Sequence, residues 1–128
     1  MLIGDLGKVC GCPVETIRYY EKIGLLPKAI RSSNGYRNYD DHHRKWLQFI
    51  LKSRGLGFTQ DEVRLLTEIA QMQEPACNEV HSILTDHASQ IHNKIRDLKR
   101  LEKAVTRLKA KCEDGLLNEC PVIDELMI

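Results

Sequence analysis

The feature that most constrains the fold is residues 78–111, a stretch without proline or glycine. Its apolar side chains recur in steps of three and four, the period of a coiled-coil seam, with one three-residue stammer between Ile95 and Leu101. The seam consists of Leu84, Ala88, Ile91, Ile95, Leu98, Leu101, Val105 and Leu108. A helix with one long apolar stripe needs a partner. The pattern predicts a long helix that pairs with another helix, the alternative being packing on the front of its own chain.

Two cysteines lie at the ends of this helix. Cys77 and Cys112 are 35 residues apart, or five heptads, so both lie on the seam. At about 1.5 Å per residue roughly 52 Å separates them, whereas two thiolates on one metal ion lie about 4–5 Å apart. If both bind one ion, they come from different subunits. An antiparallel homodimer would place Cys77 of one subunit beside Cys112 of the other, with a metal site at each end.

A third cysteine, Cys120, follows Cys112 across a loop that contains Gly115, and Pro121 then begins a short terminal helix. Three thiolates carry a charge of −3, which favours a soft divalent ion such as Zn, Cd, Hg or Pb. Two thiolates alone would suit Cu(I). For Cys77, the alternative is a small apolar residue in the seam.

Further donors lie near these thiols. One of Glu113, Asp114 and Glu119 could supply an oxygen ligand, the alternative being that all three solvate the loop, and His81 or His87 could supply an auxiliary nitrogen ligand. Cys10 and Cys12 have no third ligand nearby in the sequence, so we expect core packing for Cys10 and a cap-like role for Cys12. We expect the pair His42-His43 to be solvated or near phosphate.

The front of the chain has the pattern of a helix-turn-helix. Ile3, Leu6 and Val9 have helical spacing up to Gly11, and Pro13 begins a second helix that Gly24 ends. Residues 31–39 then read as a β-hairpin, because Asn34-Gly35 is the strongest signal for a type I′ turn. We interpret this hairpin as a wing that lies along a phosphate backbone. The predicted DNA-binding residues are Thr16, Arg18, Tyr19, Arg31, Tyr36 and Arg37.

Two connecting helices follow the hairpin. Asp40 or Asp41 can cap the first of them, and Thr59 with Glu62 forms a capping box for the second. Their predicted apolar faces contain Trp46, Leu47, Ile50 and Leu51 in the first helix, and Leu65, Leu66 and Ile69 in the second. Pro75 marks the end of this predicted helical region.

The charge distribution agrees with a nucleic-acid partner. Residues 1–54 contain ten Lys/Arg and five Asp/Glu, whereas residues 55–128 contain nine and thirteen. No apolar run approaches the ~20 residues of a membrane span, so we expect a cytoplasmic protein with reduced thiols. No nucleophile–base set, phosphate loop or HExxH motif is visible in the sequence, and we expect no enzymatic activity.

These parts closely resemble the MerR family of bacterial transcription factors. The matching segments are Ile3 to Leu6, Glu15 to Glu21, Gly24 to Pro27, Arg31, Gly35 to Arg37, Tyr39, Leu56 to Thr59, the long helix and Cys112 to Pro121. The resemblance implies a mainly α fold: a winged helix-turn-helix DNA-binding domain with connector helices (1–75), a dimerisation helix in an antiparallel coiled coil (76–111), and a metal-binding loop with a short C-terminal helix (112–128).

The resemblance also bears on the metal. Cysteine at position 77 is similar to the divalent-metal branch, whereas copper sensors typically have serine there; the seven-residue loop between Cys112 and Cys120 resembles the copper sensors. Cys12-Pro13-Val14 resembles cadmium and lead regulators, and Glu119 to Ile123 resembles mercury regulators. We expect Cd, Pb or Hg ahead of Zn, with Cu(I) as the alternative.

The resemblance implies a regulator that represses or activates a heavy-metal resistance promoter. Its homodimer would distort operator DNA when metal binds, and would act together with RNA polymerase. Two hypotheses that assign the chain to other functional classes stay open. One is a thiol redox sensor in which Cys112 and Cys120 form a disulfide, and the other is a metal buffer or chaperone.

Overall fold

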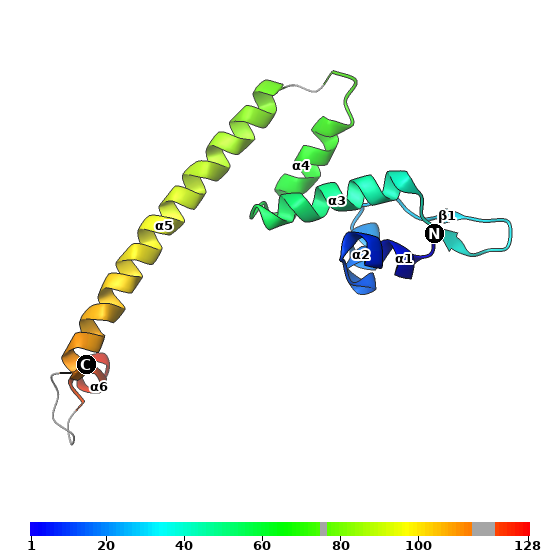
Figure 1. Cartoon of the computed structure of the whole chain (residues 1–128). Coiled ribbons are helices and arrows are strands. Elements are labelled where there is room, and N and C mark those ends of the chain that lie inside the picture. Colours follow the sequence, from blue (N-terminus) through cyan, green and yellow to red (C-terminus); the bar gives the residue numbers. More distant parts are fainter. Residues whose placement is uncertain (75–76, 114–119) are drawn as a thin grey trace. The chain divides into compact units, whose positions relative to one another are not determined.

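The computed structural model describes residues 1–74, 77–113 and 120–128. These residues are mostly helical, as expected, with one small hairpin (Figure 1). The chain forms two compact units, Met1–His81 and Ser82–Ile128, which are described separately. Among the described residues, no helix is both long and apolar enough to cross a membrane.

The helix-turn-helix begins the first unit, with α1 at Ile3–Cys10 and α2 at Val14–Lys22. The turn between them is tight, since a Cβ added at Gly7 would lie 2.7 Å from the carbonyl oxygen of Cys12. The Cys12 amide donates to the Gly7 carbonyl at 2.9 Å. Our expectation for the two cysteines was wrong: Cys12 is the buried one, Cys10 is half-buried, and Pro13 is the N-cap of α2. The hydrogen bond from the Cys12 amide to the Gly7 carbonyl holds Cys12 against α1.

The hairpin consists of β1 (Ile30–Arg31) and β2 (Arg37–Asn38), paired antiparallel with Arg31 opposite Arg37. The predicted type I′ turn is wrong, because Asn34 does not have a positive φ and only Gly35, at 83°, does. The Gly35 amide donates to the Ser32 carbonyl and the Ser32 amide to the Tyr36 carbonyl, both at 2.9 Å. A three-residue loop that ends in a left-handed glycine satisfies this register.

Helices α3 (Asp41–Gly55) and α4 (Gln60–Ala70) follow the hairpin in the first unit. Asp40 caps α3 by accepting the His43 amide at 3.1 Å, and the predicted Thr59–Glu62 capping box is confirmed. His43 is buried, so our expectation of a solvated residue was wrong. Its Nε2 lies 2.9 Å from the Lys28 carbonyl oxygen and donates to it.

Apolar side chains from α1, α2, α3 and α4, and from the segments that connect them, build the core of the first unit. The fully buried ones are Leu6, Ile17, Leu26, Tyr39, Leu47, Ile50 and Val63. Each aliphatic side chain of this kind stabilises the fold by roughly 1.5–3 kcal/mol. Leu65 of α4 is exposed and Val63 takes the inward position, which corrects the predicted face of that helix. Arg64 donates to the Ile23 carbonyl at 2.6 Å and so connects α4 to the end of α2.

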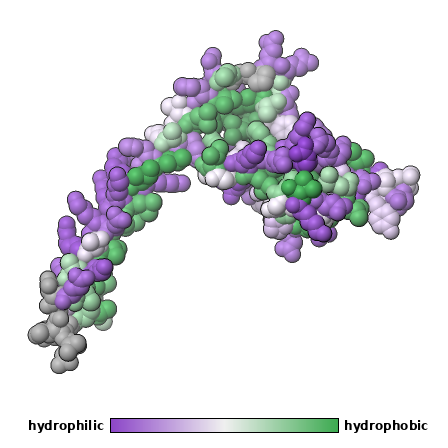
Figure 2. Space-filling view, in the orientation of Figure 1, coloured by the Kyte–Doolittle hydropathy of each residue, from purple (hydrophilic) through white to green (hydrophobic). Residues whose placement is uncertain are grey.

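The long helix α5 runs without interruption from Cys77 to Glu113, and α6 spans Pro121–Leu126. The large apolar side chains of the seam, from Leu84 to Val105, are exposed. Figure 2 shows apolar atoms gathered along one edge of this helix and polar atoms along the other. An apolar stripe of this extent indicates an interaction surface.

Candidate functional site

The second helix of the helix-turn-helix presents the first group of predicted DNA-binding residues. Arg18 and Tyr19 are exposed on α2, and Thr16 is half-buried. The Tyr19 hydroxyl donates to the Gln60 side-chain oxygen at 3.2 Å, which orients this ring from the start of α4. The exposed side chains of α2 can therefore reach a partner without a change of fold.

The structure brings the three predicted arginines together in one cleft. Arg18 from α2, Arg31 from β1 and Arg37 from β2 line it, and its volume is about 340 Å³. We call it the basic cleft, and its lining residues are Arg18, Glu21, Lys22, Lys28, Ala29, Arg31 and Arg37. Tyr36 is exposed on the wing but does not line this cleft.

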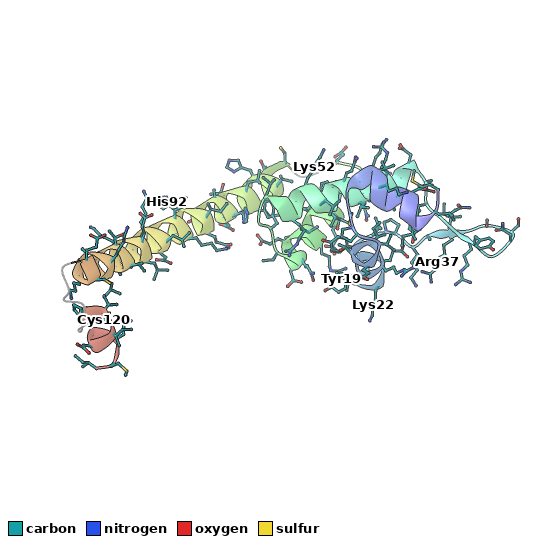
Figure 3. The ribbon with its side chains drawn as sticks, turned by 60° about the horizontal axis from the view of Figure 1, so that its bottom comes forward. Tyr19, Lys22, Arg37, Lys52, His92 and Cys120 are labelled. Atoms are coloured by element: carbon teal, nitrogen blue, oxygen red, sulfur yellow. The ribbon has the colours of Figure 1, made fainter. Side chains whose placement is uncertain are left out.

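The sequence analysis did not single out Lys22 and Lys28, although both line the basic cleft. Lys22 follows Arg18 by one helical turn, so the spacing i, i+4 could have revealed it. Lys28 lies in an irregular segment after α2, where no periodicity exists to place it. Figure 3 shows Tyr19, Lys22 and Arg37 along one side of the first unit, with Lys52 of α3 on the other.

A buried hydrogen bond lies beneath the cleft. The Tyr39 hydroxyl donates to the carboxylate of Glu21, and both residues are buried. Burial first, then the hydrogen bond and charge of Glu21, raise the pKa of Tyr39 to about 12, although Arg37 and Arg18 oppose the shift. Tyr39 therefore keeps its proton at neutral pH and remains a donor to Glu21.

The three predicted metal-binding thiols are accessible. Cys77 and Cys112 are exposed at opposite ends of α5, and Cys120, the N-cap of α6, is half-buried. Lys111 of α5 and Glu125 of α6 form an ion pair at 2.8 Å, which places α6 against the end of α5. Cys112 and Cys120 belong to these two connected segments, while Cys77 belongs to the first unit.

The donor set fits a soft metal ion, because free and accessible thiols are the ligands that such ions prefer. Among the described residues, no group of three potential ligands is assembled within one chain. About 52 Å of continuous helix between Cys77 and Cys112 gives the reason. Asp114 and Glu119 lie outside the described residues. His81 is exposed and His87 is buried on α5.

The two remaining thiols have a different environment. Burial raises the pKa of Cys10 and of Cys12, and for Cys12 the neighbouring Cys10 adds to the shift. A raised pKa lowers the thiolate fraction, and the thiolate is the form that binds metal. This pair is therefore a poorer soft-metal ligand than an exposed thiol.

Two protein-family models match the chain. "MerR family regulatory protein" covers residues 2–39, and "MerR, DNA binding" covers residues 44–108. The chain belongs to the MerR family. Its members are transcription regulators rather than enzymes, in agreement with the sequence analysis. The resemblance inferred from the sequence is thereby confirmed.

Curated and solved relatives extend over nearly the whole chain. The mercuric resistance operon regulatory protein of Bacillus cereus is 39% identical over 98% of this chain and 96% of its own. The crystal structure of PbrR691 from Ralstonia metallidurans CH34 in complex with lead(II) matches with a TM-score of 0.87 and 36% identity, over 98% of each chain. MerR from Bacillus megaterium MB1, in complex with mercury(II), matches with a TM-score of 0.78 and 34% identity, over 100% of each chain. These similarities confirm the winged helix-turn-helix and the long helix of the fold.

Proposed function

We propose that this MerR-family protein is a heavy-metal-responsive regulator that binds promoter DNA as an antiparallel homodimer. The metal ligands would be Cys112 and Cys120 of one subunit together with Cys77 of the partner subunit. The observation that carries the proposal is the placement of free thiols at both ends of a helix whose apolar seam is exposed. One act of pairing would bury the seam and complete two metal sites.

The charge pattern of α5 supports the antiparallel orientation. Residues 94–111 contain eight Lys/Arg and two Asp/Glu, whereas residues 77–93 contain no Lys/Arg and two Asp/Glu. An antiparallel pair that aligns Cys77 with Cys112 sets each basic half beside the acidic half of the other helix. A parallel pair would set the two basic halves side by side, which is unfavourable.

The metal we propose is a soft divalent ion, with Cd, Pb and Hg ahead of Zn. Three thiolates compensate a +2 charge better than a +1 charge. Two of the relatives described above were solved in complex with lead(II) and mercury(II), which supports the same class of ion for this chain. When bound, the ion would cross-link the loop after α5 to the first unit of the other subunit.

DNA binding would use Thr16, Arg18, Tyr19, Arg31, Tyr36 and Arg37, as predicted from the sequence. Contacts from these residues to phosphates position the protein and depend strongly on salt. The response to metal requires two arrangements of the dimer on DNA, because a ligand shifts an equilibrium only by its different affinity for the two states. We propose that the metal-bound arrangement distorts the promoter so that RNA polymerase can use it.

A reporter experiment tests this function. Transcription is measured from the promoter adjacent to the gene, with Hg, Cd, Pb, Zn or Cu(I) added. We expect induction by a soft divalent ion, its loss in Cys77→Ser, and its retention in the matched control Cys10→Ser. Footprinting without metal should show the same protection for all three proteins. Induction by the divalent ion that survives in Cys77→Ser would contradict the proposal.

A copper regulator is the second candidate, and one observation favours it. The Lys111–Glu125 ion pair connects the segments that contain Cys112 and Cys120 within one chain, and two thiolates suit linear Cu(I). In that case Cys77→Ser would retain the Cu(I) response. The same set of variants therefore separates the two functions.

A further inference from the structure

The basic cleft concentrates positive charge beyond what the predicted arginines account for. Five cationic side chains and one carboxylate line it, a formal charge of +4 in about 340 Å³. In the part of the chain that the structure describes, none of the five cations forms an ion pair with an acidic side chain. Like charges gathered in a concave surface raise the local potential and attract a polyanion.

Hydrogen bonds hold the three walls of the cleft. The α2 wall, with Arg18 and Lys22, is joined to the end of β2 by the Glu21–Tyr39 hydrogen bond. The Lys28 wall is joined to α3 by the hydrogen bond from His43 Nε2 to the Lys28 carbonyl at 2.9 Å.

The third wall is the hairpin, where Arg31 and Arg37 are directly paired across β1 and β2. The Tyr39 amide that follows β2 donates to the Met1 carbonyl at 2.8 Å, so the end of this strand is also held from the start of α1. All three backbone segments of the cleft are therefore held by hydrogen bonds, which fixes the positions from which the five cationic side chains extend.

We propose that the basic cleft binds backbone phosphates of double-stranded DNA, with Lys22 and Lys28 as direct contacts and with Glu21 and Tyr39 as positioning residues. Arginine forks bind phosphate oxygens in a bidentate manner, and lysines add mobile point charges around them. The cleft lies between the second helix of the helix-turn-helix and the wing, where a strand that contacts both elements would pass. The inference rests on the DNA binding proposed above.

The salt dependence of DNA binding tests the lysines. Affinity of the full-length protein for a mixed-sequence duplex of about 30 base pairs is measured by fluorescence anisotropy at several KCl concentrations. Each lost phosphate contact should reduce the slope of log K against log[KCl] by about 0.9. We expect that reduction, per subunit, for Lys22→Gln and for Lys28→Gln, and their sum in the double variant. Lys52→Gln, on the other side of the unit (Figure 3), should keep the native slope.

Two substitutions test the positioning pair, at a temperature where circular dichroism shows each variant fully folded. Glu21→Gln keeps an acceptor for the Tyr39 hydroxyl and removes one negative charge, so it should bind DNA more tightly. Tyr39→Phe changes no charge but removes the hydrogen bond, so it should bind DNA several-fold more weakly. A role in stability alone would leave the affinity of folded Tyr39→Phe at the native value, and that result would overturn the positioning role.

The outcomes also separate this inference from the proposed function. A native protein that fails to bind DNA would refute the proposed function itself. A native protein that binds DNA, with a slope that Lys22→Gln and Lys28→Gln leave unchanged, would overturn only the role of the two lysines.

Discussion

The two units of the molecule use apolar side chains in opposite ways. In α3, Leu47 and Ile50 are fully buried, whereas in α5, Leu98 and Leu101 are 63% and 61% exposed. The first unit therefore has its own core, whereas the apolar side of the long helix is exposed, as expected for the proposed pairing with a second helix. Under the proposed function, the DNA-binding surface would therefore belong to one chain, whereas the proposed three-thiol metal site would require two.

The largest effect should come from a charge in the seam. Leu101→Asp would place an unpaired carboxylate from each subunit in the buried helix interface, at a cost of several kcal/mol. We expect the dimer to weaken by about 1000-fold or more, as measured by sedimentation equilibrium. Lys103→Asp, about 200° around the helix from Leu101, serves as the control. A Leu101→Asp protein that still dimerises like the native protein would contradict the assignment of the seam.

A cavity in the core of the first unit should have the next largest effect, on the stability of that unit. Leu47→Ala removes a fully buried side chain and should lower the free energy of unfolding of the first unit by about 2–5 kcal/mol. Urea denaturation followed through the single tryptophan, Trp46, would measure it. We expect this loss to be the same at low and high protein concentration, since the core lies within one chain. A loss that vanishes at high concentration would show that the first unit also depends on a second copy.

The smallest of these effects is a dependence on alkaline pH in the first unit. The pKa of Tyr39 is raised from 10 to about 12 in the folded protein, so its stabilising contribution is complete below pH 10. It should be lost as the pH rises to about 12, a change of about 2 kcal/mol. Unfolding free energies of the native protein and Tyr39→Phe, compared between pH 9 and 11, would measure it. Parallel pH profiles for the two proteins would contradict this role of Tyr39.

The parts that the sequence predicted correctly are those with a local cause. The continuous helix α5 with its apolar stripe follows from periodicity, and the Thr59–Glu62 capping box follows from residues three positions apart. The errors concern features that residue type alone does not decide. Asn34-Gly35 suggested a type I′ turn, but the Arg31–Arg37 pairing sets a longer loop.

In the candidate site, too, the sequence predicted some residues and missed others. Three arginines were predicted from their residue types and their elements, whereas Lys28 lines the cleft from an irregular segment whose backbone carbonyl accepts a hydrogen bond from the distant His43. The burial of His43 and of Cys12 likewise depends on contacts that no short pattern contains. The pairing of thiols from two subunits stays a prediction, and it rests on distance, because a continuous helix fixes the separation of its ends.

The most direct test of the central claim is complementation between two defective subunits. Cys77→Ser protein and a Cys112→Ser/Cys120→Ser protein are mixed, allowed to exchange subunits, and titrated with Cd²⁺ while sulfur-to-metal charge-transfer absorption is recorded. Neither homodimer should show the signal of a three-thiolate site. The mixed dimer should recover one such site per dimer, because one end then contains Cys77, Cys112 and Cys120 from opposite subunits. A mixed dimer with no recovered site, or a Cys77→Ser homodimer that retains the native signal, would contradict the account.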